Sequence, residues 1–199
     1  MMLDIKYIKK YNSLGKQKKK TQIVLANTLR STETFLAKLD SRFNGKYSKI
    51  PNFLVSRDGT ITQLLKSQEH ANFLSTININ RNSVVVCLEN LGWLEKEPLT
   101  SNYINWIGDI YNGPVCEKKW RDYFFWQPYT TTQLDKTVEL CKKICDEVSI
   151  KKNFIGHNTK INGIEKFEGI VCRSNYDTET TDVSPSFEFE YFNKKIENE

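Results

Sequence analysis

The sequence of 199 residues is 39% hydrophobic and 12% aromatic, and its formal net charge is +5. A chain of this length and apolar content can bury one full core, so we expect a single domain. No apolar run approaches the roughly 18 residues of a membrane-spanning helix, and the basic start lacks the apolar stretch of a secretory signal. These features argue against a membrane protein and favour synthesis in the cytoplasm.

Most of the positive excess lies in residues 1–21, which we interpret as a basic N-terminal arm with a short strand and a solvated lysine run. Such a run is more often a plain charged loop than a nucleic-acid site, so we do not expect a nucleic-acid partner. The five cysteines form no CxxC pair, and their odd number favours reduced thiols. Cys141 and Cys145 are four residues apart and are expected to be small buried hydrophobic side chains.

The first regular elements are expected between residues 22 and 88. Gln22–Leu25 is a short β-type run, and residues 83–88 (SVVVCL) are typical of a central strand covered on both faces. Between them, two apolar runs flank Asp58-Gly59, which predicts a β-hairpin. A helix is expected ahead of the hairpin, capped by Ser31 or Thr32 and ended by Gly45, with an apolar face of Phe35, Leu36, Leu39 and Phe43.

A second helix is expected after Thr130, because Thr130 and Gln133 match a capping box. Phe154-Ile155 then predicts a short buried strand. Strands that alternate with helices indicate an α/β fold with a mixed central β-sheet flanked by helices, over residues 22–192. Residues 193–199 are expected to be a frayed polar tail. The apolar stripe of the second helix comprises Leu134, Val138, Cys141, Cys145 and Val148.

The segment 92–129 is unusually aromatic and contains all four tryptophans of the chain. Asn112-Gly113-Pro114 predicts a turn between its two halves. The segment is either a ligand-facing aromatic wall or partner surface, or a small satellite core under a hairpin excursion. We treat it as an insertion in the domain and favour the satellite core.

Several motifs occur in the order of one known family. The run VSRDGTITQL, His70 in SQEHANF, SVVVCLEN, IGH and TDVSPSF together resemble the N-acetylmuramoyl-L-alanine amidases of bacteriophage lysozyme-amidases and peptidoglycan recognition proteins. The resemblance implies a mixed sheet flanked by helices and a zinc ion in a cleft, with three protein ligands and one water. Zinc would activate that water to cleave the amide between the lactyl group and L-alanine.

The resemblance also implies that the zinc site of this chain is degenerate. His157 in the IGH motif matches the second ligand, and Asp182 matches the third. The first ligand, a histidine at the end of the opening strand, is replaced by Ala26, with Asn27 beside it. Alanine offers no lone pair, and a neutral amide is a poor zinc ligand. The site is therefore partial, and His157 can instead form an ion pair with Asp182 in the absence of metal.

Other cleft positions also depart from the family. Pro51-Asn52 stands where many members carry a tyrosine, and Thr180 stands where a lysine or arginine stabilises the developing oxyanion. His70 matches a substrate-contacting histidine, and a rearranged loop would make it a third zinc ligand beside His157 and Asp182. The expected cleft residues are thus His70, Asn27, Pro51, Asn52 and Thr180.

Two functions follow from this resemblance. The sequence favours a catalytically impaired protein that keeps the amidase fold, holds no zinc, and binds a peptidoglycan fragment or a protein partner. The alternative is an active zinc amidase with a substituted ligand set. The Lys-, Asn- and Ile-rich composition suggests a bacteriophage source, with the virion or the host cell as the place of action.

Overall fold

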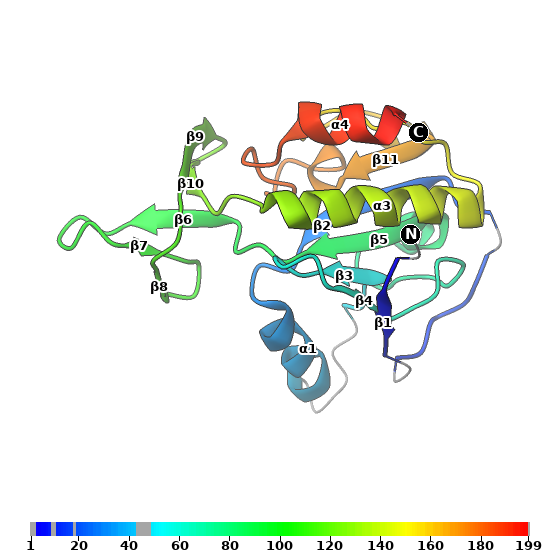
Figure 1. Ribbon diagram of the computed structural model, residues 1–199, viewed down its shortest axis with the longest axis horizontal. Helices are drawn as coiled ribbons and strands as arrows, with labels where there is room; N and C mark the ends of the chain where they lie inside the picture. Colours follow the sequence, from blue (N-terminus) through cyan, green and yellow to red (C-terminus); the bar gives the residue numbers. More distant parts are fainter. Residues whose placement is uncertain (1–2, 9–10, 18, 43–48, 199) are drawn as a thin grey trace.

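The computed structural model describes residues 3–8, 11–17, 19–42 and 49–198 of the chain (Figure 1). Its centre is a six-stranded sheet with the order β1-β4-β3-β5-β2-β11. All neighbouring strands are parallel except β3 and β4, which form an antiparallel pair. The strands are β1 (Ile5–Tyr7), β2 (Gln22–Asn27), β3 (Phe53–Val55), β4 (Ile61–Gln63), β5 (Ser83–Leu88) and β11 (Gly169–Cys172).

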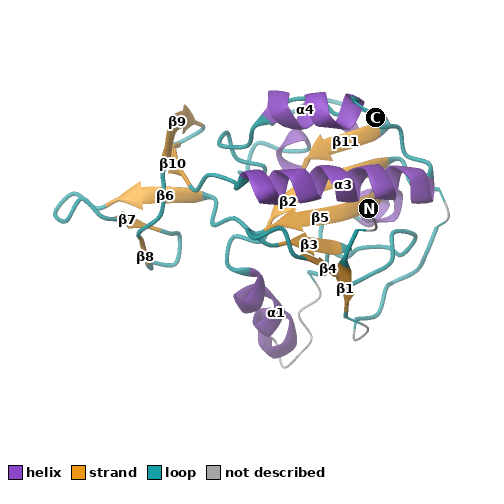
Figure 2. Cartoon of the chain, in the orientation of Figure 1, coloured by secondary structure: helices purple, strands orange, loops and turns teal. Residues whose placement is uncertain are grey.

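Helices cover both faces of this sheet (Figure 2). The long α3 and the C-terminal α4 pack on one face, and α1 covers the other. The helices are α1 (Thr32–Ser41), α2 (Ile77–Asn82), α3 (Thr131–Val148) and α4 (Phe189–Glu197), with short 3₁₀ helices at Ile164–Lys166 and Arg173–Asn175. The mixed α/β fold expected from the sequence is therefore present. No helix of the described residues is long and apolar enough to cross a membrane.

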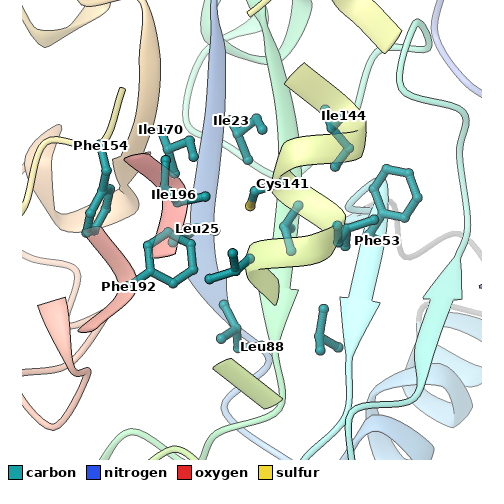
Figure 3. Close-up of a cluster of buried hydrophobic side chains, with 14 of the residues drawn as sticks. Ile23, Leu25, Phe53, Leu88, Cys141, Ile144, Phe154, Ile170, Phe192 and Ile196 are labelled. Atoms are coloured by element: carbon teal, nitrogen blue, oxygen red, sulfur yellow. The ribbon is translucent and has the colours of Figure 1, made fainter. Parts of the chain in front are cut away.

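The core is divided by the sheet, because every residue of β2 and β5 is buried and successive side chains point to opposite faces. Ile23 and Leu25 face α3 and α4, where they meet Cys141 and Phe192 (Figure 3). On the other face, Val24, Ala26, Val85 and Cys87 pack with Phe35 and Leu39 of α1. Burial on both faces explains the continuous apolar run of residues 83–88.

Most sequence predictions for the central elements are confirmed. Ser31 caps α1 by accepting a hydrogen bond from the backbone N–H of Thr34, and Thr130 caps α3 in the same way. Gln133 does not complete a capping box, because its amide donates to the carbonyls of Val55 and Glu89. The β3–β4 hairpin forms as expected, and Cys141 and Cys145 are buried. The predicted helix residues Phe43 and Gly45 lie outside the described residues.

The structure corrects three predictions, which concern the C-terminal tail, Lys20 and the strand at Phe154-Ile155. Residues 189–197 form α4, so the polar tail expected to fray is helical up to Glu197 and buries Ile196 against α3. In the basic arm, Lys20 is fully buried rather than solvated, with its ammonium donating to backbone carbonyls. The predicted strand at Phe154-Ile155 is a single parallel bridge from Phe154 to Ile170 of β11, a strand that was not predicted.

The aromatic segment forms a second sheet that projects from the main body (Figure 1). It is antiparallel, with the order β8-β7-β6-β10-β9, and we call it the accessory sheet. Trp126 is fully buried, and Trp93 stacks on Tyr123 with ring centroids 4.6 Å apart. The accessory sheet thus has packed aromatic contacts of its own, as a satellite core would, while Trp106 is 40% exposed. The strands are β6 (Trp93–Lys96), β7 (Tyr103–Ile104), β8 (Ile110–Tyr111), β9 (Cys116–Trp120) and β10 (Tyr123–Trp126).

Candidate functional site

Asp182 is buried at the carboxyl end of β2, with 2% of its surface exposed. Its Oδ2 accepts a hydrogen bond of 3.0 Å from the backbone N–H of Asn27, the last residue of that strand. The same oxygen lies 3.4 Å from the guanidinium Nη1 of Arg173, which follows β11 directly. The neighbouring parallel strands β2 and β11 therefore both end at the Asp182 carboxylate. The strand β2 supplies the backbone N–H of Asn27, and the residue after β11 supplies the guanidinium of Arg173.

The charge of Asp182 is balanced by Arg173. Burial raises the pKa of Asp182, whereas the guanidinium of Arg173 and the hydrogen bond from Asn27 act in the opposite direction. The Arg173 guanidinium lies 5.4 Å from the ring centre of Phe73, which gives it a second favourable contact. Arg173 thus holds a positive charge beside the carboxylate that the resemblance assigns to zinc.

Ala26 faces the same corner of the molecule. Its side chain is fully buried on the α1 face of the sheet, and its register partner across β2 and β5 is Cys87. The pKa of the Cys87 thiol is raised by burial and by Asp182 and lowered by Arg173, so both charged groups lie near this thiol. At Ala26 the opening strand therefore carries a methyl group on the same face as Cys87, at the position that the family resemblance assigns to an imidazole.

Asn27 belongs to a buried polar network on the other face of β2. Its side-chain oxygen accepts a hydrogen bond of 2.8 Å from the hydroxyl of Tyr129, and that hydroxyl accepts one from the backbone N–H of Ser184. Burial raises the pKa of Tyr129, which keeps the phenol protonated as a donor. The network connects β2 to the segment after Asp182 and fixes that segment against the sheet.

His157 does not join the Asp182 carboxylate. It is exposed, and its Nδ1 accepts a hydrogen bond of 3.2 Å from the backbone N–H of Thr159. Its backbone carbonyl accepts a hydrogen bond from the side chain of Asn175, which ties the IGH turn to the 3₁₀ helix of Arg173. The expected His157–Asp182 ion pair is replaced by the Arg173–Asp182 pair.

His70 lies toward the opposite end of β2. Its backbone N–H donates to Ser13 Oγ and to the carbonyl of Gly15, so the N-terminal segment covers it. The pKa of His70 is lowered by burial and by the nearby charges of Lys20 and Arg81. Lys20 stands just before β2, whereas Asp182 binds the last residue of that strand. The rearranged set of His70, His157 and Asp182 is therefore not assembled in this structure.

The other three residues predicted to line the cleft are Pro51, Asn52 and Thr180. Pro51 and Asn52 are buried before β3, and the Asn52 amide donates to the carbonyls of Lys66 and Glu69 while its oxygen accepts from the N–H of Val85. This pattern is structural. The Thr180 carbonyl accepts a hydrogen bond from Arg121 of the accessory sheet, so an arginine does reach this position, but from a distant part of the chain.

A cavity of about 200 Å³ opens beside Arg173 and Asn27, between the end of β2, α1 and the accessory sheet. We call it the basic pocket. Its apolar walls are the rings of Phe35, Phe73 and Trp106, and the indole N–H of Trp106 donates to the carbonyl of Leu29 at 2.8 Å. The sequence did not single out its cations, because they come from four separate segments. These cations are Arg30, Lys38, Arg42, Lys49 and Arg173.

The fold and motif order agree with a comparison to known families. The family model for N-acetylmuramoyl-L-alanine amidases matches residues 16–169. This chain belongs to the N-acetylmuramoyl-L-alanine amidase family. The match ends before Asp182. Among curated proteins, no significant match was found.

Solved amidase structures share the fold at low sequence identity. The amidase LysC from Clostridium intestinale URNW is 11% identical, with a TM-score of 0.59 and 97% of each chain covered. The amidase LysCS from the same organism is 12% identical, with a TM-score of 0.60 over 98% of this chain and 97% of that one. The E. coli amidase AmiD, solved with anhydro-N-acetylmuramic acid-L-Ala-D-gamma-Glu-L-Lys, is 17% identical, with a TM-score of 0.55 over 94% of this chain and 60% of that chain.

The residues of this corner do not fit the zinc ion that the family implies. A catalytic zinc site needs three protein ligands with free lone pairs and an open fourth position. Here Ala26 supplies none, Asp182 is occupied by Asn27 and Arg173, and His157 is exposed and engaged by Thr159. Within the described part of the chain, no cluster of three or more His, Cys, Asp or Glu side chains is suited to hold a metal.

Proposed function

We propose that this chain uses the amidase fold to bind a muropeptide without zinc-dependent hydrolysis. The observation that carries the proposal is the ion pair between Arg173 and Asp182 beside Ala26. A guanidinium at this carboxylate supplies the positive charge that a metal would otherwise supply. It also repels a second cation, because like charges at such distances disfavour each other in a buried corner.

Loss of hydrolysis follows from the same arrangement. In the family's chemistry the zinc-bound water is the nucleophile, and the metal polarises the scissile carbonyl. An arginine donates hydrogen bonds, but it cannot coordinate a water molecule and lower the pKa of that water as a zinc ion does. With Arg173 in place of a metal, the charge of Asp182 is still balanced, but no zinc-bound water is available to act as the nucleophile.

Binding is supported by the cavity beside the pair. The basic pocket lies at the carboxyl ends of the parallel strands, where open α/β sheets commonly bind ligands. It combines apolar rings with a few polar groups, as ligand sites do. AmiD, a protein of the same fold, was solved with a muramyl peptide that contains a γ-linked D-glutamate. A muropeptide of this type is the ligand class we propose for the basic pocket.

The test is binding and turnover measured on the same purified protein. We expect N-acetylmuramyl-L-alanyl-D-γ-glutamyl-L-lysinamide to bind with a measurable Kd and purified peptidoglycan to remain uncleaved. Trp106→Ala should weaken binding, because Trp106 lines the basic pocket, whereas Phe124→Ala removes an exposed ring of the accessory sheet outside it. Hydrolysis that requires zinc would establish the active amidase instead. Absence of both binding and turnover would leave a protein partner as the ligand.

A further inference from the structure

We infer that the basic pocket selects its ligand through a free carboxylate, which the cations of α1 and the end of β2 bind. This inference rests on the proposed muropeptide function, and it names the chemical group of the muropeptide that the pocket recognises. Five Arg or Lys side chains line the cavity, and no Asp or Glu side chain of the described residues does so. A concave site with charges of one sign concentrates ligands of the opposite sign.

The cations of the pocket fall into two groups according to their partners. Arg173 is neutralised by Asp182, so its charge stabilises the protein itself. Arg30 lies over the ring of Trp106, with its guanidinium carbon 5.2 Å from the ring centre. Lys49 donates a hydrogen bond of 3.4 Å to the backbone carbonyl of Phe73. Within the described residues, no carboxylate lies within ion-pair distance of Arg30, Lys38 or Lys49. These three charges are therefore available to a ligand.

The position of Arg30 over the Trp106 ring restricts this guanidinium. A guanidinium held over an indole by a cation–π contact loses rotational freedom and can still donate hydrogen bonds to a ligand. The planar fork of donors that every guanidinium carries matches the two oxygens of a carboxylate. Because Trp106 is itself fixed by its hydrogen bond to Leu29, the donor fork is preorganised before a ligand binds.

The size and the walls of the pocket limit the ligand. About 200 Å³ is less than the roughly 300–1,000 Å³ of pockets that enclose a drug-sized molecule. One side branch of a ligand fits, and the rest of the ligand must lie outside. The rings of Phe35 and Phe73 line the pocket together with the cations, so it offers both an apolar surface for hydrocarbon and positive charge. A short carbon chain that carries a carboxylate meets both requirements, and the α-carboxylate of a γ-linked glutamate is such a group.

The decisive probes differ by one group. N-acetylmuramyl-L-alanyl-D-γ-glutamyl-L-lysinamide carries the α-carboxylate of glutamate as its single carboxylate, and its D-isoglutamine counterpart carries an uncharged amide of the same shape at that position. We expect the acid to bind at least about tenfold more tightly in calorimetry, because hydrogen bonds to a charged group are roughly twice as strong as neutral ones. Equal affinities for the two probes would overturn the inference while leaving the proposed muropeptide function intact.

Variants of the lining residues test whether the difference in affinity between the two probes arises in the basic pocket. Arg30→Gln and Lys38→Gln should each reduce acid binding about tenfold and reduce amide binding by a smaller factor, since the charge contact is made with the acid alone. Lys194→Gln removes an exposed lysine of α4 far from the pocket and should change neither. Inorganic phosphate is the third probe, and phosphate binding tighter than the acid would overturn the carboxylate assignment. If neither muramyl probe binds, the inference fails together with the proposed function.

Discussion

Arg173 Nη1 lies 3.4 Å from Asp182 Oδ2, so an arginine that follows one parallel strand neutralises a carboxylate fixed at the end of the next. Asp182 is almost fully buried, whereas the Arg173 side chain is 29% exposed. A carboxylate buried to this extent requires a partner, because an unpaired charge is costly to remove from water. The pair therefore balances the charge of the buried Asp182 with a side chain of the protein itself.

The first prediction concerns the energetic coupling within this pair. Arg173→Met should destabilise the fold by roughly 1–3 kcal/mol, because Asp182 then loses its cationic partner and keeps backbone donors such as the Asn27 N–H. In Arg173→Met/Asp182→Asn the charge is gone, so the loss should be smaller than the sum of the single variants. Urea unfolding of the four proteins measures this coupling. Strict additivity would show that the two side chains do not interact.

The second prediction concerns the missing ligand position. Ala26→His should destabilise the protein by about 1–3 kcal/mol, because it overpacks a fully buried position. It should not recruit zinc, since His157 is exposed and Arg173 occupies Asp182. Ala37→His, at an exposed position of α1, is the matched control and should stay within about 0.5 kcal/mol of wild type. A stoichiometric zinc in Ala26→His would show that the remaining ligands are already in place.

The third prediction concerns α4. Phe192 is fully buried and packs edge-on against Phe154, with ring centroids 5.0 Å apart. Phe192→Ala should therefore cost about 3–5 kcal/mol of unfolding free energy. Lys194→Ala, on the exposed side of the same helix, should change stability by less than about 0.5 kcal/mol. A small effect of Phe192→Ala would mean that the C-terminal segment does not pack as α4.

The fourth prediction concerns pH. Burial and the charges of Lys20 and Arg81 lower the pKa of His70 below its ordinary value of 6.5. Between that value and the lower folded pKa, the unfolded chain binds a proton that the folded chain does not. Stability should therefore be steady above this window and fall as pH drops through it.

Urea midpoints between about pH 7 and about pH 5 test this sign, because that range covers the titration of histidine. His70→Gln should flatten the fall, since the substituted side chain does not titrate. If His157→Gln flattened the curve equally, the effect would not belong to His70.

The sequence predicted the elements whose signals are local. The caps of α1 and α3, the Asp58-Gly59 hairpin and the continuous run of β5 depend on neighbouring residues and formed as expected. The helix α4 was missed, because the alternating Phe and Glu of residues 187–190 conceal the i,i+4 pair of Phe192 and Ile196. That pair becomes visible only when α3 provides a surface for it.

The candidate site depends on contacts that no local pattern encodes. Ala26 and Asp182 were located by motif order, and the structure places both at the carboxyl end of β2. Arg173 carried no signal in the sequence, because its meaning comes from the parallel pairing of β11 with β2. Lys20 was interpreted as a solvated charge, yet the chain buries it and lowers its pKa to about 8. A charge run does not reveal which of its members faces inward.

The zinc content of the purified protein, measured after exposure to excess zinc and removal of loosely bound metal, tests the central claim most directly. The Arg173–Asp182 pair and Ala26 predict less than about 0.1 zinc per chain, because a site without its ligand shell has little affinity. They also predict that purified peptidoglycan stays intact in the same sample. One zinc per chain, together with zinc-dependent release of stem peptides, would contradict this account.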